Sequence, residues 1–200
     1  MVCIMGEYQI IDGVLEEMKQ QSMLKDRNIV LLDDFTMESC YKIQYSIQKI
    51  VRMDDIEGKL IKDRKPITIN INSNGGDVFA AFGLISYIER LKEQGYKINT
   101  YINTIALSCG FLLAIVGSHR VMNRRAVALM HQMSTGARGT VQDIFESVDF
   151  DREYWDRNKK YILQYTNFTE EELDEMQKRK LDKWMFAEEM LEKGCIDEII

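Results

Sequence analysis

Hydrophobic side chains recur along the chain with two periods, one typical of strands and one typical of helices. In residues 67–72, isoleucine alternates with threonine and asparagine, which predicts a strand with one buried face. Residues 28–32 form a short apolar run between charged residues and predict another buried strand. After Thr36 the apolar positions recur every three or four residues, as on one face of a helix. These positions are Met37, Cys40, Ile43, Ile47 and Ile50.

The alternation of strand and helix continues through the middle of the chain. The turn at residues 73–76 (SNGG) leads into a predicted helix over residues 78–94, which Gly95 caps. Further strands are predicted at residues 96–103 and 126–130, with an apolar helix at 108–116 between them. Strands joined by crossovers of helical length pair in parallel, so the pattern predicts an α/β fold.

The last third of the chain is mostly helical. Thr140, with Asp143 three residues later, predicts the start of a helix that runs from about residue 141 to 165. Thr169 and Glu172 form a second capping box, and residues 188–193 continue helical before a short strand in residues 195–200. We expect a single domain over residues 28–200, preceded by an N-terminal segment of residues 1–27.

Composition narrows the class of protein. The 200 residues carry 26 basic and 32 acidic side chains, a net charge of −6, which does not favour nucleic-acid binding. The four cysteines form no CxxC pair, so neither a metal site nor a disulfide framework is expected. The N-terminus lacks a basic region before an apolar run, and the longest apolar stretch is too short for a bilayer. These features predict a cytoplasmic protein without membrane contact.

Candidate chemistry begins with the two histidines. His119 lies in a polar turn, where a solvated surface position is favoured, whereas His131 follows the predicted strand 126–130. The carboxyl ends of strands are where clefts form in open α/β sheets, although a structural histidine is an equal alternative there. Ser108 lies at a strand-to-helix junction and fits either a nucleophile or an ordinary N-cap. Its neighbour Cys109 is a possible thiol nucleophile, with packing inside the helix favoured.

These candidates are expected to meet at one edge of the sheet. Two consecutive βα units bring the Gly75-Gly76 turn and Ser108 to the same edge, and His131 ends the next strand there. A nucleophile, a base and backbone N–H donors together are what acyl transfer requires.

Four blocks of the sequence resemble a known family. INSNGGDV, ALSCGFLLA, ALMHQ and DKWMFAEEMLEKGCIDEI are similar, in this order, to blocks of the proteolytic subunits of the Clp protease, the ClpP family. The resemblance covers about residues 28–200. It implies a ClpP/crotonase-like fold of stacked βαβ units with a protruding helical handle. It also implies a serine endopeptidase with a Ser-His-Asp triad.

The resemblance assigns roles to residues of this chain. Ser108 matches the nucleophile and His131 the general base, and the N–H groups of Gly76 and Cys109 match the oxyanion hole. Residues 133–139 match the strand and turn that line the substrate groove in the family, and residues 141–165 match the handle helix.

The third triad member is less directly aligned. A count without gaps places the family's acid at Lys178, so we expect the acid to be Asp182, the nearest one after the helix, with Asp174 as the reserve.

The resemblance further implies self-assembly into two stacked, heptameric rings. ATP would be used by an AAA+ unfoldase partner, and no cofactor is expected in this subunit. Thr68 and Asn70 stand where the family has aromatic residues for docking the unfoldase, so docking is expected to differ. Asn74, Thr104 and Leu107 also depart from the family pattern near the nucleophile.

Three questions stay open from the sequence. The apolar residues on helix 141–165 fit either packing on its own domain or contact between subunits. A crotonase-like acyl-CoA enzyme shares the fold and the paired N–H donors, but needs no triad. A non-catalytic scaffold subunit is the other alternative, and the presence of both Ser108 and His131 speaks against these last two.

Overall fold

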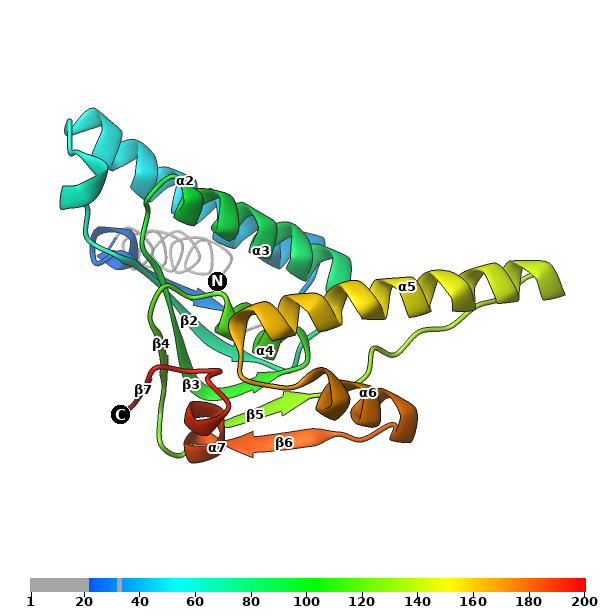
Figure 1. Cartoon of the computed structure of the whole chain (residues 1–200). Coiled ribbons are helices and arrows are strands. Elements are labelled where there is room, and N and C mark those ends of the chain that lie inside the picture. Colours follow the sequence, from blue (N-terminus) through cyan, green and yellow to red (C-terminus); the bar gives the residue numbers. More distant parts are fainter. Residues whose placement is uncertain (1–21, 32–33) are drawn as a thin grey trace, which may run out of the picture.

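The computed structural model describes residues 22–31 and 34–200. In this part of the chain, seven strands form one sheet (Figure 1). They are β1 (Asn28–Leu31), β2 (Ile67–Ser73), β3 (Ile98–Leu107), β4 (Arg120–Met122), β5 (Val127–Met130), β6 (Lys183–Phe186) and β7 (Glu198–Ile199). All pairings are parallel except that of β5 with β6, which is antiparallel. The expected α/β fold with a parallel sheet is confirmed.

Strand β3 holds two parts of the sheet together. It pairs with β2 between residues 98 and 106 and, at residues 100–102, with β4. Its second half pairs with β5 over residues 105–107. A register irregularity between Ile71 and Ser73 accompanies this change of partner. Strand β5 therefore lies beside the carboxyl end of β3, directly before Ser108.

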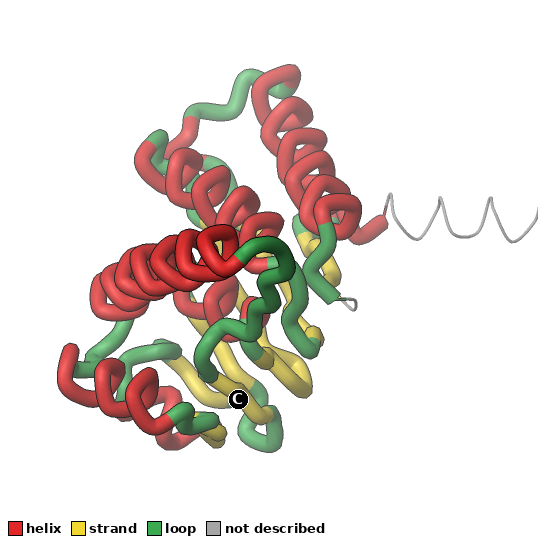
Figure 2. The backbone as a smooth tube through the Cα atoms, turned by 90° about the vertical axis from the view of Figure 1, so that its right-hand side faces the viewer, coloured by secondary structure: helices red, strands yellow, loops and turns green. Residues whose placement is uncertain are grey.

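Helices cover the sheet and extend beyond it. They are α2 (Met37–Ile56), α3 (Val78–Glu93), α4 (Cys109–Ile115), α5 (Val141–Tyr165), α6 (Glu170–Arg179) and α7 (Ala187–Glu192), with a 3-10 turn at Ile61–Asp63. Figures 1 and 2 show α2 and α3 side by side along the sheet, and α5 projecting away from it. The alternating isoleucines of β2 are all buried, as the sequence pattern predicts.

The predicted helix starts in the last third are confirmed by their hydrogen bonds. The Thr140 side chain accepts from the Asp143 N–H while Asp143 accepts from the Thr140 N–H, and Thr169 and Glu172 form the same reciprocal pair. Each pair satisfies N–H groups that a helix end leaves unbonded, which sets where α5 and α6 begin.

Some boundaries differ from the prediction. Strand β3 runs over residues 98–107 rather than 96–103, and α7 covers 187–192 rather than 188–193. Strands β4 and β6 were not predicted. In β6 the exposed positions are aromatic, Trp184 and Phe186, on either side of the buried Met185, so no polar–apolar alternation marks the strand. Strand β4 has only three residues, too few to establish a period.

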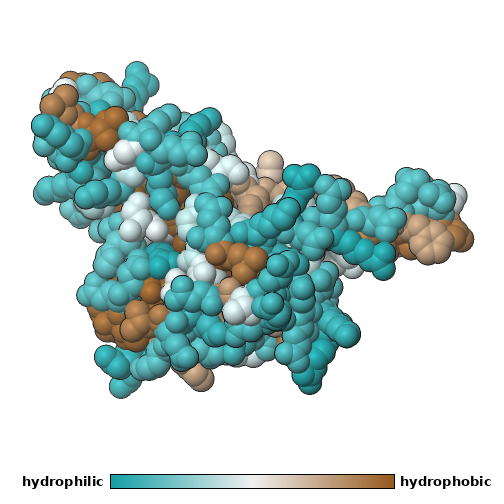
Figure 3. Space-filling view, viewed as in Figure 1, coloured by the Kyte–Doolittle hydropathy of each residue, from teal (hydrophilic) through white to brown (hydrophobic). Residues whose placement is uncertain are grey.

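The outer end of α5 has a distinct surface. Figure 3 shows hydrophobic side chains gathered at the tip of this helix, where Val141 and Phe145 are exposed. Among the described residues, no helix is both long enough and apolar enough to cross a membrane.

Candidate active site

Ser108 occupies the junction between β3 and α4. Its backbone has φ 55° and ψ −115°, in a region that non-glycine residues rarely adopt. The Ser108 N–H donates to the Leu129 carbonyl of β5 at 2.8 Å, which ties the junction to the neighbouring strand. The Ser108 hydroxyl makes no capping hydrogen bond, so the interpretation of this residue as an ordinary N-cap is not supported. A sharp strand-to-helix turn of this kind exposes a side chain at the sheet edge.

The Gly75-Gly76 turn after β2 packs directly against this junction. Gly75 has φ 107°, and a Cβ atom there would lie 2.6 Å from the Ser108 Cβ, so the close approach requires glycine. A Cβ on Gly76 would lie 2.4 Å from the Phe35 carbonyl oxygen, because this residue bridges to the segment before α2. The turn therefore lies against Ser108 with its backbone.

The two expected oxyanion donors flank Ser108. The N–H groups of Gly76 and Cys109 donate to no residue in the described part of the chain. The Cys109 Sγ donates instead to the Gly76 carbonyl at 3.3 Å, which joins the two segments. An N–H without a partner beside a nucleophile is available to a ligand oxygen.

Sheet register relates the segment that precedes His131 to the segment that follows Asp182. Strand β5 ends at Met130, directly before His131, and the last residue pair of its ladder with β3 joins Leu107 to Leu129. In the antiparallel ladder of β5 with β6, Met130 pairs with Lys183. His131 and Asp182 each lie one residue beyond this last pair of the ladder. The unpredicted strand β6 thus begins directly after the expected acid and pairs with the strand that leads to the histidine.

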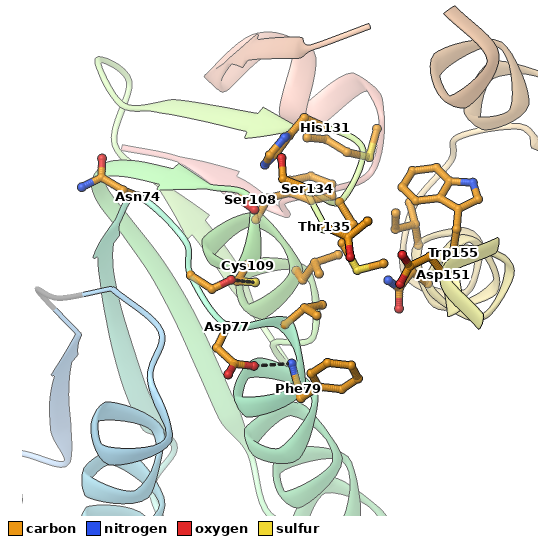
Figure 4. Close-up of a pocket in the computed structure, with 18 residues that line it drawn as sticks. Asn74, Asp77, Phe79, Ser108, Cys109, His131, Ser134, Thr135, Asp151 and Trp155 are labelled. Atoms are coloured by element: carbon orange, nitrogen blue, oxygen red, sulfur yellow. Dashed lines mark hydrogen bonds between the residues drawn. The ribbon is translucent and has the colours of Figure 1, made fainter. Parts of the chain in front are cut away.

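Ser108 and His131 open into one cavity of about 550 Å³. The cavity is lined by residues of the glycine turn, the β3–α4 junction, the segment after β5 and helix α5. They are Asn74, Gly76, Asp77, Val78, Phe79, Ser108, Cys109, Phe111, Leu112, Met130, His131, Met133, Ser134, Thr135, Asp151, Trp155, Asn158 and Ile162. Figure 4 shows Ser108 and His131 on one side of this space and Asp151 and Trp155 on the other.

Cys109 is unsuited to the role of nucleophile. Its side chain is buried in the core, and burial raises the pKa of the thiol to about 11. The thiolate, which is the reactive form, is thus suppressed at neutral pH. The sequence interpretation of Cys109 as a packing side chain is confirmed.

The remaining candidates are separated from this cavity. Asp182 is exposed and is not among the cavity-lining residues, although it precedes β6 beside the end of β5. The reserve acid Asp174 lies on α6, where it accepts from the Lys159 Nζ at 2.7 Å. His119 is exposed and pairs with Glu198 at 2.9 Å, a surface position as expected. In the described residues, no group of three or more His, Cys, Asp and Glu is arranged to hold a metal ion.

Sequence reasoning missed the contribution of α5 to the cavity. Asp151, Trp155, Asn158 and Ile162 all line it from one face of this helix. Their spacing of four, three and four residues is the signal that was available, because it marks a single helical stripe. The presence of a polar residue at two of the four positions obscured it.

An α/β fold with a serine at a strained strand-to-helix turn and a histidine after a strand that pairs with it defines a candidate hydrolase class. A family model described as Clp protease matches residues 14–200. The chain therefore belongs to the Clp protease family, and the resemblance to ClpP is confirmed. This match favours a Clp protease over a crotonase-like enzyme.

Individual relatives are similar at low identity. ATP-dependent Clp protease proteolytic subunit 2 of Treponema denticola is 27% identical over 179 residues, which cover 90% of this chain and 84% of that protein. Proteolytic subunit 1 of Chlamydia trachomatis serovar D is 26% identical over 190 residues, covering 93% and 92% respectively. Proteolytic subunit 2 of Borreliella burgdorferi is 28% identical over 131 residues, and this match covers 66% of the chain and 62% of that protein.

Proposed function

We propose that this protein is a serine-type endopeptidase that hydrolyses peptide bonds through a Ser-His-Asp triad. The observation that carries the proposal is the convergence of Ser108 and His131 on one cavity, beside the N–H groups of Gly76 and Cys109. The strained backbone of Ser108 adds support, since strain of this kind is concentrated at functional positions.

The proposed reaction has two stages. His131 accepts the proton of the Ser108 hydroxyl as Oγ attacks the scissile carbonyl carbon. The oxyanion that forms accepts hydrogen bonds from the N–H groups of Gly76 and Cys109. His131 then donates the proton to the amine nitrogen, the C–N bond breaks, and an ester on Ser108 remains. A water molecule, deprotonated by His131, attacks this ester, releases the carboxyl product and restores the hydroxyl.

Asp182 is proposed to orient His131. Because the β5–β6 ladder ends one residue short of both side chains, we propose that Asp182 accepts a hydrogen bond from the imidazole. This would hold the tautomer in which the other ring nitrogen faces Ser108. Asp174 is the less favoured alternative because Lys159 already pairs with its carboxylate.

The assembly is part of the proposal. By analogy with the relatives named as subunits of an ATP-dependent Clp protease, we propose a cytoplasmic homo-oligomer of stacked rings, heptameric by resemblance, that encloses the sites. ATP would be consumed by a partner unfoldase, and this subunit would need no cofactor. Thr68 and Asn70 are half-buried polar residues of β2, and the Asn70 amide donates to the Ile29 carbonyl at 3.4 Å. An unfoldase that docks at this strand would therefore meet polar side chains in place of the aromatic ones that the family resemblance implies.

Labelling by a fluorophosphonate probe tests the nucleophile. The purified protein is expected to be labelled, and Ser108→Ala is expected to abolish labelling. Ser134→Ala is the matched control, because this second serine also lines the cavity and should retain labelling. Labelling that persists in Ser108→Ala would refute the assignment, and a protein that is never labelled and cleaves no peptide would support the scaffold alternative.

Hydrolysis of a fluorogenic peptide separates the two candidate acids. Asp182→Asn is expected to lower kcat on a fluorogenic peptide by about a thousandfold or more, since it would favour the wrong histidine tautomer. Asp174→Asn should lose only an exposed ion pair and retain nearly full activity. The reverse result would transfer the role to Asp174.

A further inference from the structure

One wall of the cavity is a stripe along the inner half of α5. From the outer end inward it presents Asp151, Trp155, Asn158 and Ile162. Figure 4 shows Asp151 and Trp155 facing the space opposite Ser108 and Cys109. A substrate side chain that entered beside Ser108 would therefore meet this helix.

The charges around the cavity have one sign. The lining residues include two carboxylates, Asp77 and Asp151, and neither lysine nor arginine. Asp77 caps α3, since its Oδ1 accepts from the N–H groups of Phe79 and Ala80. The Asp151 carboxylate has no hydrogen bond or ion pair with any residue that the structure describes. It is thus the charge in this wall that is free to receive a ligand.

The cations nearest along α5 are occupied elsewhere. Arg152 pairs with Asp149 at 3.2 Å, and Lys159 pairs with Asp174 and Glu170 on the side of α6. A bare carboxylate that faces a partly enclosed space gains most from a cation delivered by a ligand, because solvent screens the pair less there.

Asn158 gives an independent sign that the wall receives a ligand. Its side chain is only 6% exposed and lines the cavity, yet it makes no hydrogen bond to a described residue. Buried polar groups are normally hydrogen-bonded, and the exceptions call for an explanation. A polar group of the substrate would satisfy this amide.

The rest of the lining is apolar. Seven large hydrophobic side chains surround the polar groups: Phe79, Phe111, Leu112, Met130, Met133, Trp155 and Ile162. Such walls favour a long aliphatic stem, whereas Asp151 and Asn158 favour a hydrogen-bonding cation at its end. Lysine and arginine are the amino acids with both properties.

We propose that this cavity receives the side chain on the amino side of the scissile bond and that Asp151 makes it select lysine or arginine. This inference rests on the proposed endopeptidase function. Asp151 acts here as a specificity-determining residue, through an ion pair with the substrate, and takes no part in bond cleavage.

Matched peptides test the selection. Two fluorogenic peptides that differ only in lysine or norleucine before the cleaved bond share the alkyl stem and differ in the charge. The lysine peptide is expected to have a kcat/KM about tenfold higher, the factor that one charge-assisted hydrogen bond supplies. Asp151→Asn should remove this preference, so that the two peptides have nearly equal kcat/KM values.

Asp156→Asn is the control variant. Asp156 lies on the same helix but is exposed and does not line the cavity, so its loss changes the net charge equally and should keep the lysine preference. Equal or better cleavage of the norleucine peptide by the unmodified enzyme would overturn the inference and leave the peptidase function standing.

A binding assay keeps the test independent of catalysis. In the Ser108→Ala background, fluorescent peptides that end in lysine or norleucine are compared by fluorescence polarisation. Tighter binding of the lysine peptide, lost on addition of Asp151→Asn, supports the inference even when no peptide is hydrolysed. Equal binding of the two peptides overturns it. Failure of the proposed function would appear separately, as absence of both cleavage and fluorophosphonate labelling.

Discussion

The two walls of the cavity are built in different ways. The sheet-side wall consists of the glycine turn, the β3–α4 junction and the end of β5, which are joined by backbone hydrogen bonds and close backbone contacts. The helix-side wall is the inner half of α5, a helix whose outer half projects from the domain (Figure 1). Ser108 and His131 lie on the first wall and Asp151 on the second.

In the proposed enzyme, the sheet-side wall carries out the reaction and the helix-side wall selects the substrate. Positions on the sheet-side wall are determined by backbone geometry, so small displacements there would affect any substrate. The helix-side wall is held by side-chain contacts, among them the Tyr161 hydroxyl, which donates to the Leu112 carbonyl of α4 at 2.7 Å. Substitutions on α5 can therefore alter the shape and charge of the cavity without moving the nucleophile.

The largest expected effect is on the sheet-side wall. Gly75→Ala would place a Cβ 2.6 Å from the Ser108 Cβ, at a backbone φ of 107° that alanine adopts only with strain. Displacement of Ser108 should lower the rate of fluorophosphonate labelling by about a hundredfold, as a misplacement of about 1 Å can. The measurement is the labelling rate of folded protein, verified by circular dichroism.

Gly83→Ala is the control for that variant. Gly83 lies within α3 with no atom close to the position of an added Cβ, so the same substitution should preserve labelling and stabilise the helix by about 0.5–1 kcal/mol. Normal labelling of Gly75→Ala would mean that the glycine turn does not position the nucleophile.

Much of the sheet-side wall was accessible from the sequence. The alternation in residues 67–72 predicted β2, and the Gly75-Gly76 turn, Ser108 and His131 were all expected at one sheet edge. These predictions succeed because parallel βα units fix which ends of strands share an edge. The role proposed for Ser108 comes from the family resemblance, since a serine at a helix start has an ordinary alternative.

The rest depends on tertiary contacts that local pattern does not encode. Strand β6 has exposed aromatic residues, so nothing in KWMF revealed the ladder that pairs β6 with the strand before His131. From the sequence, the apolar residues of α5 fit either packing on the domain or contact between subunits. The two halves of the helix differ in this respect. Trp155 and Ile162 are buried on the domain, whereas Val141 and Phe145 are exposed. Hydrophobic side chains therefore lie in different environments at the two ends of this one helix.

The next effect in size concerns the attachment of the helix-side wall. Tyr161→Phe removes the hydrogen bond to the Leu112 carbonyl and should lower the free energy of unfolding by about 1–2 kcal/mol. Tyr41→Phe, on the exposed face of α2, should change it little. Denaturant titrations of the three proteins make the comparison, and an equal loss in both variants would show that Tyr161 does not hold α5.

The pH dependence of the same variant sharpens the test. Burial holds the pKa of the Tyr161 phenol well above its ordinary value of 10.0. The phenol ionises more readily in the unfolded chain, so its contribution to stability is complete below pH 10 and is lost as the pH rises above it. Above about pH 10, the free energy of unfolding of Tyr161→Phe should therefore fall less steeply with pH than that of the unmodified protein.

The smallest expected effect on the domain itself lies at the outer half of α5. Phe145 is 60% exposed, so Phe145→Ser should change the unfolding free energy at low protein concentration by no more than about 0.5 kcal/mol. If this half joins subunits, the unmodified protein gains stability as its concentration rises, because association favours the folded state. Phe145→Ser should remove that gain, as measured by denaturant midpoints over a hundredfold concentration range, roughly the range in which linkage adds about 2.7 kcal/mol. A large loss at the lowest concentration would instead mean that Phe145 supports its own domain, and the contrast between the two halves of the helix would be wrong.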